Sequence, residues 1–274
     1  MKTFALALGG GGARGLAHIA VIEALDDMGV KPVAIAGTSI GALIGAAYAS
    51  GMHGKDIRRY VLGFAHNRGE TMRRLIAARA GTLGDLFAGT LGHATQINAE
   101  KFCAQFLPKG IPADFSELSI PLTVMAADIH RRQEAPLTSG PLRPALAASI
   151  AIPGLLRPVA REGRVLVDGG ATNPLPFDRL RGVADYIVAV DVLSVPPTER
   201  SDVPSAWECM YATLNIMGNA IVAAKLAHAP PDLVIRPNVG IFRTLDFYQA
   251  TAILRAADAA KAEVKERLGA LLAA

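Results

Sequence analysis

The sequence predicts an α/β protein with a largely parallel central sheet that is flanked by helices. Three observations support this fold class. Short apolar segments alternate with segments of helical length; 51% of the 274 residues are hydrophobic and 19% are charged; and only 5% are aromatic, while Ala, Gly and Leu are plentiful. Strands that are apolar throughout are typical of a parallel sheet covered on both faces. The same composition excludes an intrinsically disordered chain.

The predicted elements alternate along the chain. Strands are expected at the short apolar runs, which are residues 4–8, 33–36, 122–127, 165–167, 186–192 and 233–235. Helices are expected over residues 16–28, 40–50, 176–181 and 245–272. No internal repeat or low-complexity linker interrupts this order, so residues 1–274 are expected to form a single domain. In sheets of this type the reactive groups lie at the carboxyl ends of the strands.

Two segments differ from the rest of the chain. Residues 201–230 form a Met- and Ala-rich helical stretch around Trp207. This stretch is expected to pack on the core, with contact to lipid or to a second subunit as the alternatives. Residues 51–81 are rich in Arg, and residues 55–79, here called the basic segment, carry a local net charge of +5 while the whole chain carries +4.

The basic segment has an amphipathic pattern. Its charged residues are Lys55, Arg58, Arg59, Arg68, Arg73, Arg74 and Arg79, against Asp56 and Glu70. Leu62, Phe64, Leu75 and Ile76 are interleaved with them. Such a pattern makes the segment a candidate for contact with an anionic bilayer surface, and a solvated helix face is the alternative. Binding to nucleic acid is not indicated, because no binding motif accompanies the charge and aromatic residues are scarce.

The sequence indicates a cytoplasmic protein, peripheral to the inner face of the membrane if the basic segment binds lipid. Its two cysteines, Cys103 and Cys209, are too few for a disulfide framework and are expected to be reduced. No uninterrupted apolar run is long enough to cross a membrane. The apolar part of the N-terminal stretch, residues 4–8, ends at four glycines and is too short for a secretory signal.

A glycine-rich loop follows the first expected strand. Residues 9–15 read Gly-Gly-Gly-Gly-Ala-Arg-Gly, and Gly10, Gly12 and Gly15 have the spacing of a dinucleotide-binding loop. A nucleotide site also needs an acidic residue at the end of the second strand, where this chain has Ala-Gly-Thr-Ser at residues 36–39. The loop is therefore interpreted as an anion-binding turn of another kind, in which bare backbone N–H groups approach a negative charge.

A serine stands at the end of the second expected strand. Residues 37–41 read Gly-Thr-Ser-Ile-Gly and fit the pattern G-x-S-x-G, with a helix after them. A serine at such a sharp turn is strained and exposes its hydroxyl above the sheet, and the flanking glycines let the chain segments cross. The sequence therefore predicts that Ser39 is a nucleophile and that Gly37 and Gly41 support the turn. A serine that merely caps the helix is the alternative.

The base that would activate Ser39 is expected to be a carboxylate. The chain has six histidines, His18, His53, His66, His93, His130 and His228, and none of them follows a strand at the place of a hydrolase base. Asp128, Asp168 and Asp191 each end an apolar strand. Asp168 is followed by Gly169 and Gly170, which clear space around it, whereas Asp128 and Asp191 are interpreted as hydrogen-bonding residues. Burial would raise the pKa of an aspartate that acts as a base.

Together, these motifs resemble the patatin-like phospholipases, and specifically the bacterial members that are similar to the catalytic domain of neuropathy target esterase. The resemblance covers nearly the whole chain, and it implies a three-layer patatin-like fold. Its motifs are, in order, the loop at residues 10–15, the turn at residues 37–41, Ala148-Ser149 with Pro153, and Asp168-Gly169-Gly170 continued by Asn173-Pro174-Leu175-Pro176. All motif positions are occupied as in the family.

The resemblance implies an acyl hydrolase with a Ser–Asp dyad and no metal or cofactor. Carried over by position, Ser39 is the nucleophile and Asp168 is the base. The oxyanion hole would be formed by backbone N–H groups of Gly10, Gly11 and Gly12, with Arg14 making the loop electropositive. The expected substrates are phospholipid or lysophospholipid esters at membrane surfaces.

Three other functions remain as alternatives. A carboxylesterase for soluble short-chain esters would use the same machinery. A nucleotide-dependent oxidoreductase would bind a nicotinamide cofactor at the glycine loop, and a lipid-binding scaffold would keep the motifs without hydrolysis. A homo-oligomer is also compatible with the sequence.

Overall fold

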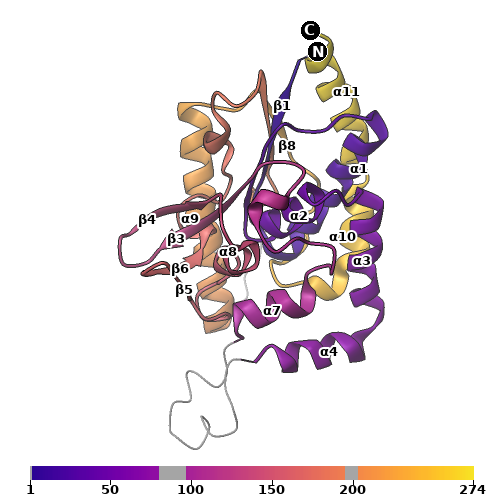
Figure 1. Ribbon diagram of the computed structural model, residues 1–274. Helices are drawn as coiled ribbons and strands as arrows, with labels where there is room; N and C mark the ends of the chain where they lie inside the picture. The colour runs from indigo at the N-terminus through magenta and orange to yellow at the C-terminus, as the bar shows by residue number, and fades with distance from the viewer. Residues whose placement is uncertain (1, 80–96, 195–202) are drawn as a thin grey trace, which may run out of the picture.

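The computed structural model describes residues 2–79, 97–194 and 203–274 (Figure 1). Its strands are β1 (Phe4–Leu8), β2 (Ile35–Thr38), β3 (Leu122–Asp128), β4 (Gln133–Leu137), β5 (Val159–Arg161), β6 (Arg164–Asp168), β7 (Tyr186–Val190) and β8 (Leu233–Ile235). Its α-helices are α1 (His18–Met28), α2 (Ile40–Ala49), α3 (Gly54–His66), α4 (Arg68–Ala77), α7 (Ala99–Phe106), α8 (Leu142–Ser149), α9 (Ala206–His228), α10 (Ala250–Ala257) and α11 (Ala260–Ala273). Residues 80–81 and 201–202, His93, and the side chains of His66, Arg68 and Trp207 lie outside the described part.

One sheet contains all of these strands, and its centre is parallel as expected. β3, β2, β1, β7 and β8 pair in this order, each parallel to the next. The antiparallel strands β4, β5 and β6 extend the sheet at the β3 end. Strands β4 and β5 are short and partly polar, so no apolar run in the sequence predicts them.

Strands β2 and β6 approach each other along the same edge of β3. β4 pairs with β3 over Val124–Asp128, so β2 and β6 share the opposite edge. β2 runs parallel to β3 and its last residue, Thr38, pairs with Met125. β6 runs antiparallel and its last residue, Asp168, pairs with Ala126. The carboxyl ends of two strands that lie far apart in sequence therefore meet on consecutive residues of β3.

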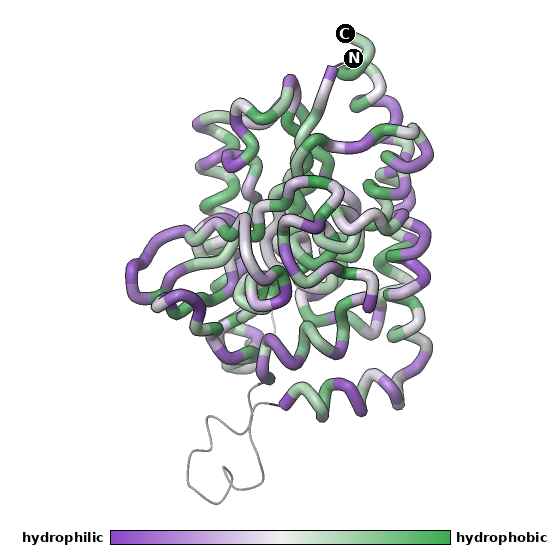
Figure 2. The backbone as a smooth tube through the Cα atoms, viewed as in Figure 1, coloured by the Kyte–Doolittle hydropathy of each residue, from purple (hydrophilic) through white to green (hydrophobic). Residues whose placement is uncertain are grey.

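Helices cover both faces of the sheet and make three layers (Figure 1). Leu6 and Leu8 of β1 point into the larger core, which is shared with α1, α2, α8, α10 and α11. Ala5 and Ala7, the alternate residues of the same strand, pack in a smaller core with Phe177 and with Val222 of α9. Figure 2 shows this arrangement as green hydrophobic residues along the central strands and purple hydrophilic ones at the outer turns and helices. Small side chains on one face of β1 let α9 lie close to the sheet.

Three of the expected helices have different boundaries. The helix expected at residues 16–28 begins as a 3₁₀ helix, Gly12–Ala17, and the one at residues 176–181 is the 3₁₀ helix Phe177–Leu180. The helix expected at residues 245–272 is divided into α10 and α11. The division leaves Asp258 between the two helices, where its carboxylate accepts a hydrogen bond of 2.6 Å from Arg58 of α3. This ion pair connects the C-terminal helices to α3.

Candidate active site

Ser39 occupies a strained turn between β2 and α2. Its φ of 54° and ψ of −123° lie in a region that residues other than glycine rarely adopt. A Cβ atom at Gly37 would lie 2.6 Å from Cα of Ala42, and one at Gly41 would lie 2.2 Å from the carbonyl oxygen of Leu8. Only glycine fits at either position, because the atoms it would meet belong to the backbone. The turn thus has the geometry that the sequence predicts.

A second serine stabilises the strained turn. The Oγ of Ser149, at the end of α8, accepts a hydrogen bond of 2.9 Å from the backbone N–H of Ser39 and donates one of 2.6 Å to the carbonyl oxygen of Met125. Ser149 is completely buried. Its hydroxyl therefore connects the turn to β3 and fixes the backbone of Ser39. In the sequence Ser149 stands out only as part of a motif, because its partners lie 110 and 24 residues away.

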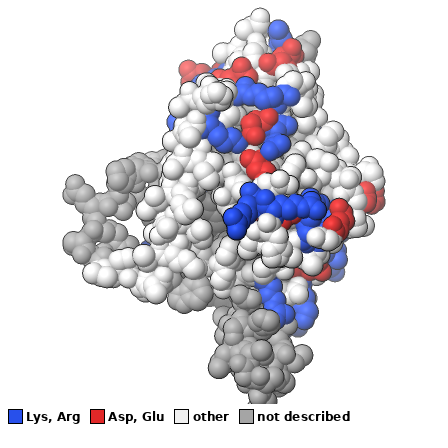
Figure 3. Space-filling model, turned by 90° about the vertical axis from the view of Figure 1, so that its left-hand side faces the viewer, with Lys and Arg blue, Asp and Glu red and all other residues white. Residues whose placement is uncertain are grey.

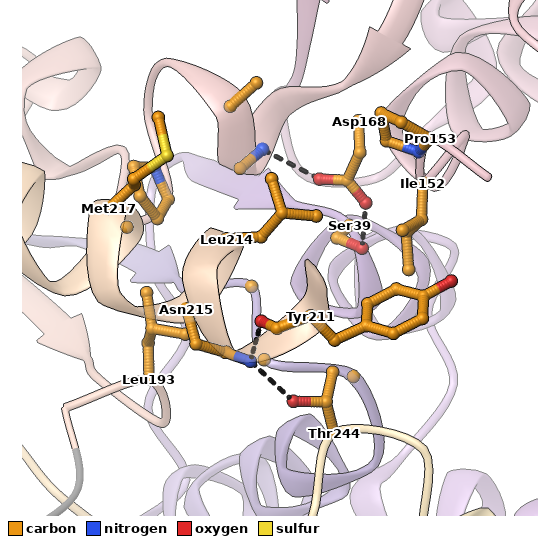
Figure 4. Close-up of a pocket in the computed structure, with 17 residues that line it drawn as sticks. Ser39, Ile152, Pro153, Asp168, Leu193, Tyr211, Leu214, Asn215, Met217 and Thr244 are labelled. Atoms are coloured by element: carbon orange, nitrogen blue, oxygen red, sulfur yellow. Dashed lines mark hydrogen bonds between the residues drawn. The ribbon is translucent and has the colours of Figure 1, made fainter. Parts of the chain in front are cut away.

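The hydroxyl of Ser39 donates a hydrogen bond of 2.6 Å to Oδ2 of Asp168 (Figure 4). The other carboxylate oxygen, Oδ1, accepts one of 2.7 Å from the backbone N–H of Gly170. A Cβ atom at Gly169 would lie 2.4 Å from the carbonyl oxygen of Met125, so the turn after Asp168 also requires glycine. Burial raises the pKa of Asp168 to about 6, although the hydrogen bonds from Ser39 and Gly170 act in the opposite direction.

The glycine loop passes directly beside Ser39. A Cβ atom at Gly10 would lie 3.6 Å from Cβ of Ser39. The N–H of Gly10 donates a hydrogen bond of 2.8 Å to the carbonyl oxygen of Pro174, so it is not available to a substrate. This corrects the expectation that all three glycines present free N–H groups. Within the described ranges, the N–H groups of Gly11 and Gly12 have no hydrogen-bond acceptor, and both residues line the same cavity as Ser39.

Position 12 requires glycine for two reasons. Its φ is +59°, and a Cβ atom there would lie 2.1 Å from the carbonyl oxygen of Thr244. The same carbonyl accepts a hydrogen bond of 2.8 Å from the N–H of Ala13. The glycine loop is therefore packed against the backbone of the segment around Thr244.

Arg14 has a different place from the one expected. Its guanidinium is buried and does not line the cavity; it donates hydrogen bonds to Oδ1 of Asn215 (2.9 Å) and Oγ1 of Thr244 (3.4 Å). Burial lowers the pKa of Arg14, and the nearby carboxylate of Asp191 opposes this effect. Arg14 thus holds α9 and the segment around Thr244 against the glycine loop, rather than facing a substrate.

Ser39 and Asp168 lie at the wall of a cavity of about 160 Å³ (Figure 4). The glycine loop forms one side of it, Ile152 and Pro153 another, and α9 a third. The lining residues are Gly10, Gly11, Gly12, Ser39, Ile152, Pro153, Asp168, Gly170, Ala171, Pro174, Leu193, Tyr211, Leu214, Asn215, Met217, Gly218 and Thr244. Most of them are apolar or small, and the few polar groups gather around Ser39 and Asn215. The contribution of α9 is not predictable from the sequence, because nothing in the pattern of residues 206–228 places this helix over the carboxyl ends of β1 and β2.

A partly buried hydrogen-bond network connects α9 to the segment that follows Asp168. Nζ of Lys225, on α9, donates a hydrogen bond of 2.6 Å to Oδ1 of Asn173 and forms an ion pair with Asp178. The carbonyl oxygen of Asn173 in turn accepts a hydrogen bond of 2.7 Å from Oγ1 of Thr38, the residue before Ser39. α9, the segment after Asp168 and the Ser39 turn are thereby held in a fixed arrangement.

The histidines that the structure describes do not lie in the cavity. His18 is completely buried, and its Nε2 lies 2.7 Å from the carbonyl oxygen of Gly9. Burial lowers the pKa of His18 to about 4, so this imidazole is neutral at pH 7 and donates to Gly9. This contact positions the glycine loop.

Asp128 and Asp191 are hydrogen-bonding residues at strand ends, as expected. Each accepts two backbone hydrogen bonds at the end of its strand, Asp128 from residues 130 and 131 and Asp191 from residues 193 and 194. Within the described chain, no group of three or more His, Cys, Asp or Glu side chains is placed to hold a metal ion.

Some cations of the basic segment form ion pairs with carboxylates of the same protein. Arg58 forms two hydrogen bonds of 2.7 Å with the buried carboxylate of Glu23, in addition to the one with Asp258. Arg74 pairs with Glu70 at 2.8 Å. These cations therefore stabilise the fold and are less available to a membrane than the sequence pattern suggested. None of the helices in the described ranges is long and apolar enough to span a bilayer.

Comparison with known proteins gives a consistent result. A family model for patatin-like phospholipases matches residues 6–181. The chain is 38% identical over 189 residues to an uncharacterised NTE family protein of Mycobacterium tuberculosis, a match that covers 69% of this chain and 48% of that protein. It is 27% identical over 271 residues to human patatin-like phospholipase domain-containing protein 6, covering 90% of this chain and 19% of the human protein.

A solved structure shares the fold. VipD from Legionella pneumophila matches with a TM-score of 0.53 and 14% sequence identity over 97% of this chain and 66% of the VipD chain. At this identity the likeness concerns the fold alone. That fold is a mixed α/β fold with a central sheet flanked by helices. The chain spans about half the length of the mycobacterial relative.

Proposed function

This chain belongs to the patatin-like phospholipase family, a family of lipid hydrolases, and we propose that it cleaves the carboxylic esters of phospholipids and lysophospholipids through an acyl-enzyme on Ser39. One observation carries the proposal: the hydrogen bond of 2.6 Å from Oγ of Ser39 to the buried Oδ2 of Asp168, in a cavity lined by the glycine loop. A serine needs an adjacent base to become a nucleophile, and Asp168 is the group in contact with it.

In the first half of the reaction, Asp168 accepts the proton of Ser39 while Oγ attacks the ester carbonyl. The resulting negative charge falls on the former carbonyl oxygen. The N–H groups of Gly11 and Gly12 are the proposed donors to this oxyanion, and the positive end of α2, which begins at Ile40, favours the charge as well. Asp168 then gives its proton to the departing lysophospholipid or glycerophosphodiester, which leaves an acyl group on Ser39.

In the second half, a water molecule releases the acyl group. Asp168 takes a proton from this water as its oxygen attacks the acyl carbonyl, and the oxyanion forms again beside the glycine loop. When the intermediate collapses, Oγ of Ser39 leaves and recovers the proton from Asp168, and a fatty acid departs. The two side chains supply nucleophile and proton transfer throughout, so no step calls on a metal ion or cofactor.

The electrostatics of the dyad support this assignment. A general base is most effective when its pKa lies near the working pH. Burial raises the pKa of Asp168 from its ordinary 3.8 to about 6, which makes it a stronger base while it stays ionised at pH 7. At its ordinary pKa of 3.8, the same carboxylate would be a weaker base toward the serine proton.

The cavity supports an ester with an apolar acyl group. Ile152, Pro153, Leu193, Leu214 and Met217 present hydrocarbon to the space beside Ser39. Apolar walls with a few polar groups at one end are typical of sites that bury the hydrocarbon part of a ligand. We infer that the acyl chain lies along α9 and that its carbonyl faces the glycine loop.

The experiment that tests this proposal compares three substrates. The purified chain would be given phosphatidylcholine vesicles, lysophosphatidylcholine micelles and a soluble butyrate ester, and the released acids would be measured by mass spectrometry. We expect fatty acid from the lipids, and background release from Ser39→Ala. Ser50→Ala, which changes a serine at the opposite end of α2, should retain the wild-type rate.

Each other result assigns a different function. Hydrolysis of the soluble butyrate alone would favour the short-chain carboxylesterase. If correctly folded protein cleaved none of the three substrates, the protein would instead be interpreted as a lipid-binding scaffold that does not hydrolyse esters.

A further inference from the structure

We propose that the outer face of α9, together with the segment at residues 241–248, docks the protein on the surface of a lipid bilayer, so that the cavity receives its substrate from the membrane. This inference rests on the proposed function, because it assigns the substrate to the bilayer. The two elements are here called the docking face. It is distinct from the basic segment that the sequence suggested.

The outer face of α9 is apolar over most of its length. Residues 209–224 contain no charged residue, between Glu208 and Lys225. Ile216 is 67% exposed and Met217 is also largely exposed, and the small side chains of Ala212, Ala220, Ala223 and Ala224 are exposed along the same helix. Helices of soluble proteins usually show charged or polar residues toward water, so this face is unusual for a helix in contact with solvent.

The segment at residues 241–248 adds large apolar side chains beside α9. Ile241 is 83% exposed and Tyr248 is 68% exposed, and Leu245 and Phe247 are exposed as well. Two contacts hold this segment against the helix: Asn215 donates a hydrogen bond of 3.1 Å to Oγ1 of Thr244, and Arg243 pairs with Glu208 at 3.1 Å. The part of the segment around Arg243 and Thr244 therefore lies directly beside α9.

The docking face is continuous with the cavity that holds Ser39. Leu214 and Met217 of α9 line the cavity, and so does Thr244. Ile216 neighbours Met217 on the helix, and Leu245 neighbours Thr244 in the chain. A lipid that leaves a bilayer in contact with this face would meet the cavity without crossing water. This continuity favours a membrane as the occupant.

The shape and charge of the face also favour lipid over protein. Figure 3 views the side of the molecule on which α9 lies; charged side chains gather at its centre and right, and few lie among the described atoms just to the left of the centre. The exposed side chains project from a helix and from an irregular segment, so they form an uneven surface. A fluid bilayer adapts to such a surface, and large apolar and tyrosine side chains are favoured at its interface.

The test measures binding to vesicles that cannot be hydrolysed. Vesicles of a diether phosphatidylcholine contain no carboxylic ester, so sedimentation of the protein with them reports docking alone. We expect the wild type to sediment with the vesicles. Ile216→Ser combined with Ile241→Ser removes two exposed side chains outside the cavity lining, and it should weaken binding about tenfold or more. Turnover of a soluble butyrate ester should stay unchanged, which also shows that the variant is folded.

The basic segment supplies a matched control. Met72 and Ile76 of α4 are exposed to 58% and 56%. Met72→Ser combined with Ile76→Ser therefore removes similar apolar groups from the competing surface. We expect this variant to bind the vesicles within about twofold of the wild type.

Four results would overturn the docking face. The wild type fails to sediment with the vesicles; the Ile216/Ile241 variant binds as well as the wild type; the Met72/Ile76 variant loses as much binding; or size-exclusion chromatography shows a dimer that only the Ile216/Ile241 variant dissociates, with vesicle binding unchanged. Failure of the proposed function is distinguishable, since a protein that sediments with diether vesicles but releases no fatty acid from ester lipids keeps the docking face and loses the hydrolase.

Discussion

Oγ of Ser39 lies 2.6 Å from Oδ2 of Asp168, although 129 residues separate the two in the chain. The sheet explains this contact. Thr38 and Asp168 end β2 and β6, and they pair with Met125 and Ala126, which are consecutive residues of β3. Because β2 is parallel and β6 antiparallel to β3, their carboxyl ends face each other along one edge. The antiparallel strand β6 is thus what brings the proposed base, Asp168, to the proposed nucleophile, Ser39.

The pH dependence of activity should report the ionisation of Asp168. A base acts only when it is deprotonated, and burial raises the pKa of Asp168 to about 6. We therefore expect kcat/KM for a soluble ester to fall about tenfold for each pH step of one below 6, and to level off above about 7. Initial rates between pH 4.5 and 8.5 measure this. A profile that is flat from pH 5 to 8 would contradict the assignment.

Asp168→Asn should abolish turnover and stabilise the fold at neutral pH. The pKa of Asp168 is about 6 in the folded state against 3.8 in the unfolded chain, so folding binds the proton more tightly. The contribution of this group to stability is therefore fully present below pH 3.8 and is lost as the pH rises through 6. Asparagine carries no such penalty and should raise the free energy of unfolding at pH 8 by up to about 3 kcal/mol.

Urea unfolding at pH 8 and pH 4.5 measures this effect. The gain from Asp168→Asn should shrink at pH 4.5, where wild-type Asp168 is protonated in the folded state. An equal gain at both pH values, or a loss at pH 8, would show that Asp168 is not held as a destabilised carboxylate.

Gly41→Ala should destabilise the protein strongly. Its Cβ would lie 2.2 Å from the carbonyl oxygen of Leu8, in the backbone of β1, which cannot move without disturbing the centre of the sheet. We expect a loss of about 3 kcal/mol or more in the free energy of unfolding. Gly63, in the last turn of α3, has nothing within 4 Å of its Cβ position, so Gly63→Ala should stabilise by about 0.5–1 kcal/mol. Similar values for both variants in urea unfolding would refute the close approach of Gly41 to the backbone of Leu8.

Arg58 and Arg59 should differ sharply although they are neighbours in the basic segment. Arg58→Met leaves the buried carboxylate of Glu23 with Lys261 as its remaining cation, at 2.5 Å, and should cost about 2–3 kcal/mol. Arg59 pairs with Asp56 at the surface, and Arg59→Met should change stability by less than about 0.5 kcal/mol. Thermal unfolding of the two variants gives the comparison, and equal melting temperatures would contradict the inward role of Arg58.

Much of the fold is predictable from the sequence because the central strands are buried on both faces. The runs at residues 4–8 and 233–235 coincide with β1 and β8, because a short apolar segment between polar turns is most stable as a buried strand. β4 lies at the edge of the sheet and contains Gln133, Glu134 and Pro136, so it does not form an apolar run and was not predicted. Periodicity indicates burial, and edge strands are only half buried.

The site was predictable where the backbone itself requires a residue type. Ser39 and its flanking glycines follow from the sharp turn, and Asp168 follows from its place before Gly169 and Gly170. The partners supplied by distant segments could not be predicted. These include the hydroxyl of Ser149 beneath Ser39, the carbonyl oxygen of Pro174 that occupies the N–H of Gly10, and the wall formed by α9. Each depends on tertiary packing that leaves no local pattern in the sequence.

Covalent labelling tests the central claim most directly. The protein would be treated with a fluorophosphonate, which phosphonylates an activated serine, and the modified peptide would be identified by mass spectrometry. The account predicts one adduct, on Ser39, that is absent from Ser39→Ala and strongly slowed in Asp168→Asn, while Ser50→Ala is labelled as the wild type is. Labelling of Ser39→Ala at the wild-type rate, or of Asp168→Asn without any slowing, would contradict it.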